Sequence, residues 1–296
     1  MSITRWAFNI RQPLLLEHIE PLVTSLTSSE KNDAIVPFSN LLSFLPKMDC
    51  DRLLELRQEE DMRRALVGRL MIHAFFTVVH SCRWENLVFS RTEANKPVLV
   101  EPAHLANVSF NISHHGDWVL FVGANTTDGT MRLGVDVMDF QEQVPGESFE
   151  TFLSCFQDQF TAAEQAFMHN AGVYAQQLRC FYRLWCLKES VVKAIGVGID
   201  YNLKALEFTV SDPEESLKPI LSTSMQVVEP QEELTDEGWA FEEALLDQNH
   251  CYAIAIQNEM QGGAPAIDAE GAKFQHLDWK GLLKHAVPYP SPYVAA

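Results

Sequence analysis

The sequence predicts an α+β fold built from two similar halves with a cleft between them. The first observation is an order of expected elements that occurs twice: a long helix, a strand, a polar excursion and a final apolar strand. The second is a pair of matches, NLVF (86–89) with ALEF (205–208) and HHGDWVLFVGAN (114–125) with DQNHCYAIAIQN (247–258). The third is size, because 296 residues, 47% of them hydrophobic, suit one large domain or two similar ones.

The first half is expected to begin with a strand at residues 3–10 and to contain a long or broken helix at residues 49–80. The apolar stripe of this helix includes Leu53, Leu66 and Phe76. Apolar runs between turn signals predict the other strands. They lie at residues 86–90, directly after Pro97, at 110–113 before an HHGD loop, and at 118–124.

The second half is expected to begin with a strand at residues 131–138. Its helices are predicted at 149–156, 161–170 and 179–195, and its later strands at 205–210, 221–228, 239–246 and 251–257. The chain therefore divides into residues 1–128, residues 129–258 and a tail of residues 259–296. This tail is rich in Gly, Ala and Pro, and we expect it to drape over the surface or to be partly disordered.

The helix at residues 179–195 has an unusual arrangement of charge. Lys188 falls in the middle of its apolar arc, whereas Glu189 and Lys193 lie one turn apart at the edge, and Gly196 follows as a C-terminal cap. One interpretation is an ordinary Glu189–Lys193 pair with Lys188 extended toward water. The other is that Lys188 meets an anion, because a buried ammonium needs one.

Composition and charge exclude several classes of protein. The 22 basic and 40 acidic residues give a net charge of −18, which argues against bulk binding to nucleic acid or to an anionic membrane. No apolar run is long enough to cross a bilayer, and we expect no signal peptide because the first residues lack a basic region followed by a long apolar run. The six cysteines form no CxxC pair and are expected to be reduced, which favours a cytosolic location.

Two carboxylates and a histidine segment are candidates for chemistry. Asp136 is expected at the end of an apolar strand, where it could bind a cation or cap a turn. Together with Glu189 it suits a Mg²⁺ ion that keeps waters and takes phosphate oxygens as further ligands. His114, which follows Ser113, could donate to a phosphate or be a solvated loop residue. No GxSxG, GxGxxG or GxxxxGK[ST] motif is present in the sequence.

Two segments together resemble the paired signature of the 4′-phosphopantetheinyl transferases. LGVDVM (133–138) is similar to the family motif G-(V/I)-D-x-E, and WCLKESVVK (185–193) is similar to W-x-x-K-E-x-x-x-K. The segments FNISHHGDWVLFVG, GRLMI and RTEANKPVL are similar to further parts of the family. The resemblance extends from about Trp6 to Gln257 and is closest to the long cytosolic transferases of animals, which are relatives of the surfactin-type enzymes.

The resemblance implies two α+β halves related by a pseudo-two-fold axis, with the active site in the cleft between them. It implies transfer of the phosphopantetheine arm of coenzyme A to a serine of an apo carrier protein, with Mg²⁺ as cofactor and 3′,5′-ADP leaving. Asp136 and Glu189 would bind the metal, and both are expected to act in catalysis with Lys193. The residues implied to bind coenzyme A are Arg52, Arg91, Lys96, Asn111, Ser113, His114, Asp136, Lys188, Glu189 and Lys193.

One position departs from the family pattern. Met138 stands where many relatives have a third carboxylate, and a thioether is a poor ligand for a hard cation, so a water is expected there. The implied carriers are of the fatty acid synthase and aminoadipate reductase types, which would connect the enzyme to fatty acid biosynthesis and lysine metabolism. Two similar halves make a monomer sufficient. The alternatives are a Mg²⁺-dependent phosphohydrolase of coenzyme A or a nucleotide, and a non-catalytic protein that binds carriers.

Overall fold

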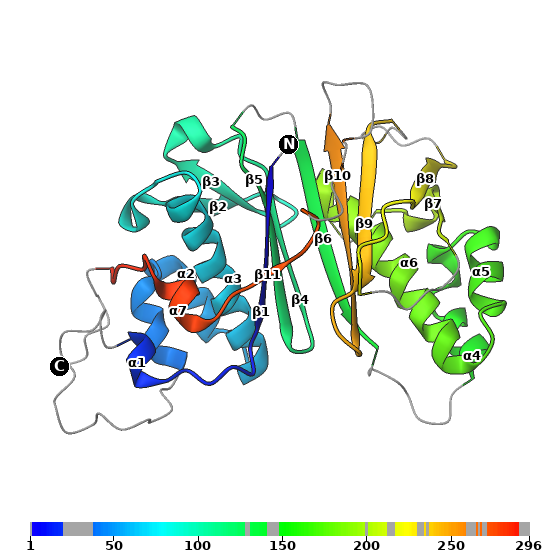
Figure 1. Ribbon diagram of the computed structural model, residues 1–296, viewed down its shortest axis with the longest axis horizontal. Coiled ribbons are helices and arrows are strands. Elements are labelled where there is room, and N and C mark those ends of the chain that lie inside the picture. Colours follow the sequence, from blue (N-terminus) through cyan, green and yellow to red (C-terminus); the bar gives the residue numbers. More distant parts are fainter. Residues whose placement is uncertain are drawn as a thin grey trace.

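Two β-sheets pack face to face in the centre of the molecule, and helices cover their outer faces (Figure 1). This computed structural model describes residues 2–19, 38–127, 131–140, 148–198, 201–211, 217–229, 237–258 and 271–289, together with single residues at 234, 265 and 267. Expected elements or tail residues outside these ranges are not described. None of the helices in these ranges is long and apolar enough to span a membrane.

The first half contains the sheet of order β11-β1-β5-β4, with α3 packed on it. The long helix predicted at residues 49–80 is broken into α2 and α3, in agreement with one of the two expectations. The strand predicted at 118–124 is β5. The elements are β1 (Ile3–Asn9), α1 (Leu16–Ile19), α2 (Lys47–Leu54), α3 (Glu59–Val78), β2 (Val88–Arg91), β3 (Pro97–Glu101), β4 (Phe110–His115) and β5 (Trp118–Ala124).

The second half contains the sheet of order β6-β10-β9, with α6 packed on it. The helix predicted at 179–195 is α6, which begins five residues earlier and ends at Gly196 in the left-handed conformation, with φ 78°. The elements are β6 (Met131–Asp139), α4 (Phe149–Ser154), α5 (Ala162–His169), α6 (Tyr174–Ile195), β7 (Leu206–Thr209), β8 (Ser224–Val227), β9 (Trp239–Leu245) and β10 (His250–Asn258). Short 3-10 helices lie at Phe38–Phe44, Trp84–Asn86, Ala103–Leu105, Gln157–Gln159 and Leu203–Ala205.

The order of elements and the pairing of strands repeat between the halves. In both, a first strand precedes the long helix, a two-stranded hairpin follows it, and two further strands complete the sheet. The order β1-β5-β4 thus corresponds to β6-β10-β9. The α+β fold with two similar halves is therefore confirmed.

The contacts between the sheets agree with a pseudo-two-fold axis. Arg5 of β1 reaches Glu242 of β9 through a buried ion pair, with Nε 2.8 Å from Oε2, while β4 lies beside β6. A two-fold axis that exchanges β1 with β6 and β4 with β9 would superimpose the β1–β9 contact on the β6–β4 contact. Apolar side chains such as Leu120, Val135 and Ile254 fill the space between the sheets.

Polar side chains of the first half bond to the backbone of β6 along the seam between β4 and β6. The amides of Leu133 and Val135 donate to the Ser109 hydroxyl and to the Asn111 side-chain oxygen, each at 3.1 Å. The Asp139 amide donates to Nδ1 of His115 at 2.8 Å. These bonds satisfy edge amides that would otherwise lack a partner, and they fix the register of the two halves.

The described part of the C-terminal tail belongs to the core of the first half, which differs from the expected surface segment. β11 (Gln275–His276) pairs in parallel with β1, and α7 (Trp279–Leu283) follows. Trp279 is only 1% exposed, and its indole N–H donates to the carbonyl of Gln12. Three large apolar side chains within five residues provide enough surface for this segment to dock.

Candidate active site

The strand β6 and the helix α6 bring the two signature motifs into contact. Gly134 makes this possible, because a Cβ atom at this position would lie 1.9 Å from the carbonyl oxygen of Ser190 and 2.5 Å from the amide of Ala194. The backbone of α6 therefore rests directly on β6, and only glycine permits that approach.

Asp136 lies inside β6 rather than at the strand end that the sequence suggested, and it is 4% exposed. Its Oδ1 accepts hydrogen bonds from the Ser113 hydroxyl at 2.8 Å and from the ammonium of Lys193 at 2.5 Å. Lys193 also donates to Ser113 at 2.8 Å, so the three side chains form a closed set. The second oxygen, Oδ2, is buried and has no hydrogen-bond partner among the described residues.

Glu189 lies half-buried on α6, close enough to Asp136 and Lys193 for their charges to act on it. Burial raises the pKa of Glu189, the Asp136 carboxylate raises it further, and Lys193 partly opposes the increase. A neighbouring carboxylate that disfavours the charged form of Glu189 indicates a site that favours a cation. Among the residues with described positions, no three His, Cys, Asp or Glu side chains form a ready-made metal cluster. The donors present fit a magnesium ion that takes only two protein ligands, because one buried carboxylate oxygen still lacks a partner.

Lys188 does not face this site. It is fully buried, and its ammonium lies 2.8 Å from Glu164 Oε2 and donates to the carbonyls of Leu203 and Leu206. Of the two interpretations of Lys188, the one in which its ammonium meets an anion is confirmed. That anion is Glu164 rather than a phosphate, so the expectation that Lys188 binds coenzyme A is not supported.

Lys96 and Asn111 reach the end of α6 from the first half. The Lys96 ammonium donates to the carbonyls of Lys193 at 2.9 Å and Ala194 at 3.1 Å. The Asn111 side chain donates to the same Lys193 carbonyl at 3.3 Å. Burial and the charge of Arg132 lower the pKa of Lys96 to about 8.

His114 lies in β4 rather than in the expected loop, and its side chain is exposed. The nearby protein atoms, which restrict its hydration, and the charges of Lys193 and Arg64 lower its pKa to about 4. The ring is therefore neutral at pH 7 in the absence of an anion. The positive charges of Lys193 and Arg64 beside the ring would attract a phosphate, and a bound phosphate would in turn favour protonation of His114.

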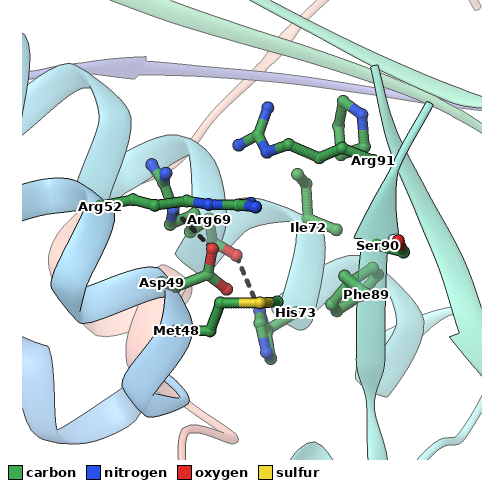
Figure 2. Close-up of a pocket in the computed structure, with 10 residues that line it drawn as sticks. Met48, Asp49, Arg52, Arg69, Ile72, His73, Phe89, Ser90 and Arg91 are labelled. Carbon is green, nitrogen blue, oxygen red and sulfur yellow. Dashed lines mark hydrogen bonds and ion pairs between the residues drawn. The ribbon is translucent and has the colours of Figure 1, made fainter. Parts of the chain in front are cut away.

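Three arginines line a hollow between α2, α3 and β2 (Figure 2). Arg52 and Arg69 project into it from the helices, and Arg91 reaches toward them from β2. Burial and the two neighbouring guanidinium groups lower the pKa of Arg91. Asp49 binds Arg69 with Oδ1 2.9 Å from Nε. The three guanidinium groups carry more positive charge than the single Asp49 carboxylate offsets, so the hollow is suited to an anion.

Arg69 is a pocket residue that the sequence did not single out, although it stands within the GRLMI segment that carried part of the resemblance. Its place inside this segment, which already carried part of the resemblance, was the signal that could have identified it.

Comparisons with known proteins agree with this geometry. The model of the 4′-phosphopantetheinyl transferase N-terminal region matches residues 33–126, and the model of the 4′-phosphopantetheinyl transferase superfamily matches residues 132–255. The chain is 32% identical over 237 residues to the L-aminoadipate-semialdehyde dehydrogenase-phosphopantetheinyl transferase of Rattus norvegicus, covering 77% of this chain and 74% of the relative.

Two relatives from other groups of organisms are also similar to this chain. A phosphopantetheinyl transferase of Thraustochytrium is 31% identical over 229 residues, covering 75% of this chain and 74% of its own. The 4′-phosphopantetheinyl transferase gsp of Aneurinibacillus migulanus is 27% identical over 188 residues, covering 62% and 61%. Both signature motifs and most of the chain are thus accounted for, and the chain belongs to the 4′-phosphopantetheinyl transferase superfamily.

Proposed function

We propose that Asp136, Glu189 and Lys193 carry the reaction of this phosphopantetheinyl transferase, which moves 4′-phosphopantetheine from coenzyme A to a serine of an apo carrier protein. The observation that carries the proposal is the environment of Asp136. One carboxylate oxygen is held by Ser113 and Lys193, while the other is buried without a partner among the described residues. Glu189 provides a second carboxylate, close enough for its charge to interact with that of Asp136. Asp136 and Glu189 would together hold a cation, and its charge would offset that of both carboxylates.

Mg²⁺ is the proposed cation, and Asp136 and Glu189 would hold it. When bound, it would stabilise the negative charge of the coenzyme A diphosphate. Met138 offers only a thioether near this set, so water and substrate oxygens would complete the coordination. Lys193 would place positive charge beside the transferring phosphate. Ser113 would keep Asp136 oriented through its 2.8 Å hydrogen bond.

The phosphates of coenzyme A are proposed to lie between two cationic regions. Arg52, Arg69 and Arg91 would bind one phosphate in the hollow of Figure 2, and His114 would take up a proton beside another. Arg91 and Lys96 stand at the two ends of one turn, so this turn connects the arginine hollow with the end of α6.

The chemistry is an in-line displacement at the phosphorus that bears pantetheine. The carrier serine oxygen forms the new bond to phosphorus, the bond to the 3′,5′-ADP oxygen breaks, and the serine proton passes to Glu189 directly or through a water. The raised pKa of Glu189 supports its assignment as the base. Catalysis would come mainly from positioning and from charge stabilisation.

The proposed partners are apo carrier domains of the aminoadipate reductase and fatty acid synthase types. The printed name of the rat relative, which includes L-aminoadipate-semialdehyde dehydrogenase, supports the first of these. We also propose a monomer in the cytosol. The absence of disulfides among the six cysteines, all of which are described, supports a reducing compartment.

The test is the mass of an apo carrier domain after incubation with coenzyme A and Mg²⁺. We expect Asp136→Ala and Glu189→Ala to abolish the addition of phosphopantetheine, and Lys193→Ala to reduce the rate on the order of 100-fold. Asp158→Ala, which removes an exposed acid of the second half, should label the carrier normally. Normal labelling by the Asp136 or Glu189 variant would contradict the assignment. Loss of coenzyme A without a labelled carrier would indicate a phosphohydrolase.

A further inference from the structure

The last carbonyls of α6 require partners that the helix itself does not supply. At a helix C-terminus the final four carbonyl groups have no amide ahead of them. In α6 the Val192 carbonyl accepts from the amide of Gly196 at 2.8 Å. The next two carbonyls, those of Lys193 and Ala194, accept from side chains of the other half of the molecule.

Asn111 joins these carbonyls to the strand that holds Asp136. It is 5% exposed, its Nδ2 donates to the Lys193 carbonyl at 3.3 Å, and its Oδ1 accepts from the Val135 amide at 3.1 Å. Turning the amide over would set its NH₂ group against the Val135 N–H and its oxygen against the carbonyl, so the pattern of donors fixes its orientation. One small side chain thus links the backbone directly before Asp136 to the backbone of Lys193.

Lys96 makes the second attachment at the same point. Its ammonium donates to the Lys193 and Ala194 carbonyls, so the Lys193 carbonyl accepts from two side chains, which matches its two lone pairs. A cation at this end also complements the helix dipole. The polar atoms of Asn111 are both engaged by the backbone, and the Lys96 ammonium is directed at α6.

We propose that Asn111 and Lys96 are positioning residues, which fasten the carbonyl of Lys193 to the first half and thereby hold the Lys193 ammonium against Asp136. This assignment rests on the catalytic roles proposed above for Asp136 and Lys193. It differs from the expectation that Asn111 and Lys96 are ligands of coenzyme A. The first half would then contribute to the chemical step by setting the place of the catalytic helix, because small displacements of a catalytic group are costly.

The experiment separates the chemical step from the binding of coenzyme A. Asn111→Asp keeps the size and the acceptor for Val135 but sets a carboxylate oxygen against the Lys193 carbonyl. We expect kcat for carrier labelling to fall about 10²-fold, as for an ångström-scale misplacement, while the Kd for coenzyme A, measured by calorimetry, changes less than about tenfold. Lys96→Met should lower kcat in the same way, and Lys96→Arg, which can still donate to both carbonyls, should restore most of it.

Ser109→Ala is the matched control, because it removes another hydrogen bond of the same seam, the one from the Leu133 amide, and leaves the bonds to the Lys193 carbonyl in place. Its kcat should stay near that of the wild type. A normal kcat in Asn111→Asp and Lys96→Met, or a loss of coenzyme A binding with kcat retained, would overturn the positioning role. If Asn111→Asp does not fold, the kcat and the coenzyme A Kd of Lys96→Met and Lys96→Arg test the positioning role by themselves. An active Asp136→Ala would instead reject the proposed site, whatever the Asn111 result.

Discussion

Asp136 uses its two carboxylate oxygens differently. One is held by Ser113 and Lys193, and the other is buried with no partner in the described part of the chain. A buried carboxylate oxygen without a hydrogen bond is costly, and such groups in native proteins tend to mark functional positions. Glu189 adds a second carboxylate whose pKa burial and Asp136 both raise. Two carboxylates therefore share the site with one cation, Lys193, which supports the second cation proposed above.

The cost of this arrangement can be measured with Glu189→Gln. Because folding raises the pKa of Glu189, its contribution to stability is present at low pH and is lost as the pH rises through the raised pKa. In the presence of a chelator we expect Glu189→Gln to raise the Tm at pH 7, with the difference from the wild type decreasing as the pH is lowered, and to abolish carrier labelling.

Asp158→Asn, at an exposed acid, serves as the control and should leave Tm and labelling unchanged. A Tm of Glu189→Gln below that of the wild type at pH 7 would show that the ionised carboxylate is favourably placed without a metal.

At the scale of elements, α6 is anchored on opposite sides by two different contacts. Toward the first half it meets Lys96 and Asn111, and on its buried side Lys188 pairs with Glu164. Glu164 also accepts from the amides of Thr161 and Phe208, so one carboxylate links α5, α6 and β7. Burial raises the pKa of Glu164 and lowers that of Lys188, and the attraction between the two groups opposes both shifts. The pair holds α5, α6 and β7 in one arrangement, because either partner alone would be a buried charge without an opposite charge.

Replacement of one partner should be severe for the fold. We expect Lys188→Met to lower the free energy of unfolding by about 3–5 kcal/mol, since it leaves the Glu164 carboxylate buried without its cation. The Kd for coenzyme A should remain close to that of the wild type under conditions where the variant is folded. Denaturant unfolding and calorimetry measure the two quantities.

Lys204→Met is the matched control, because Lys204 is exposed on the neighbouring turn and its removal should change neither quantity. An unchanged stability together with a large loss of coenzyme A affinity would return Lys188 to the role of a phosphate ligand.

At the scale of the whole molecule, residues 275–283 return to the first strand, β1. After completing the second half, it places β11 beside β1 and α7 against the core of the first half (Figure 1). The ring of Trp279 packs against Phe8 with centroids 4.6 Å apart and against Phe38 at 5.3 Å. The first half is therefore completed by residues more than two hundred positions away.

Trp279→Ala tests the contribution of this segment. Removal of a fully buried indole should lower the free energy of unfolding by about 3–5 kcal/mol, through lost burial and the cavity left behind. Chemical unfolding monitored by circular dichroism gives the value. His285→Ala, an exposed position of the same segment, should be close to neutral. A wild-type midpoint for Trp279→Ala would mean that the C-terminal segment is an accessory rather than part of the core.

The sequence by itself determined the elements and the chemical character of the site. The period of apolar residues gave α6 and its left-handed end at Gly196, and the alternation of apolar runs and turns gave most strands within a few residues. The signature motifs identified Asp136, Glu189 and Lys193, and the structure brings these three together. Such features are local, so they can be read from spacing along the chain.

Only the tertiary structure decided what these side chains contact. Three of these contacts depend on how distant segments pack. Lys188 pairs with Glu164, Lys96 donates to carbonyls of α6, and Arg69 lines the arginine hollow. Lys96 and the Lys193 carbonyl are 97 positions apart in the chain. No local periodicity encodes a contact over that distance, because it arises when the two sheets pack face to face and α6 settles on β6 over Gly134.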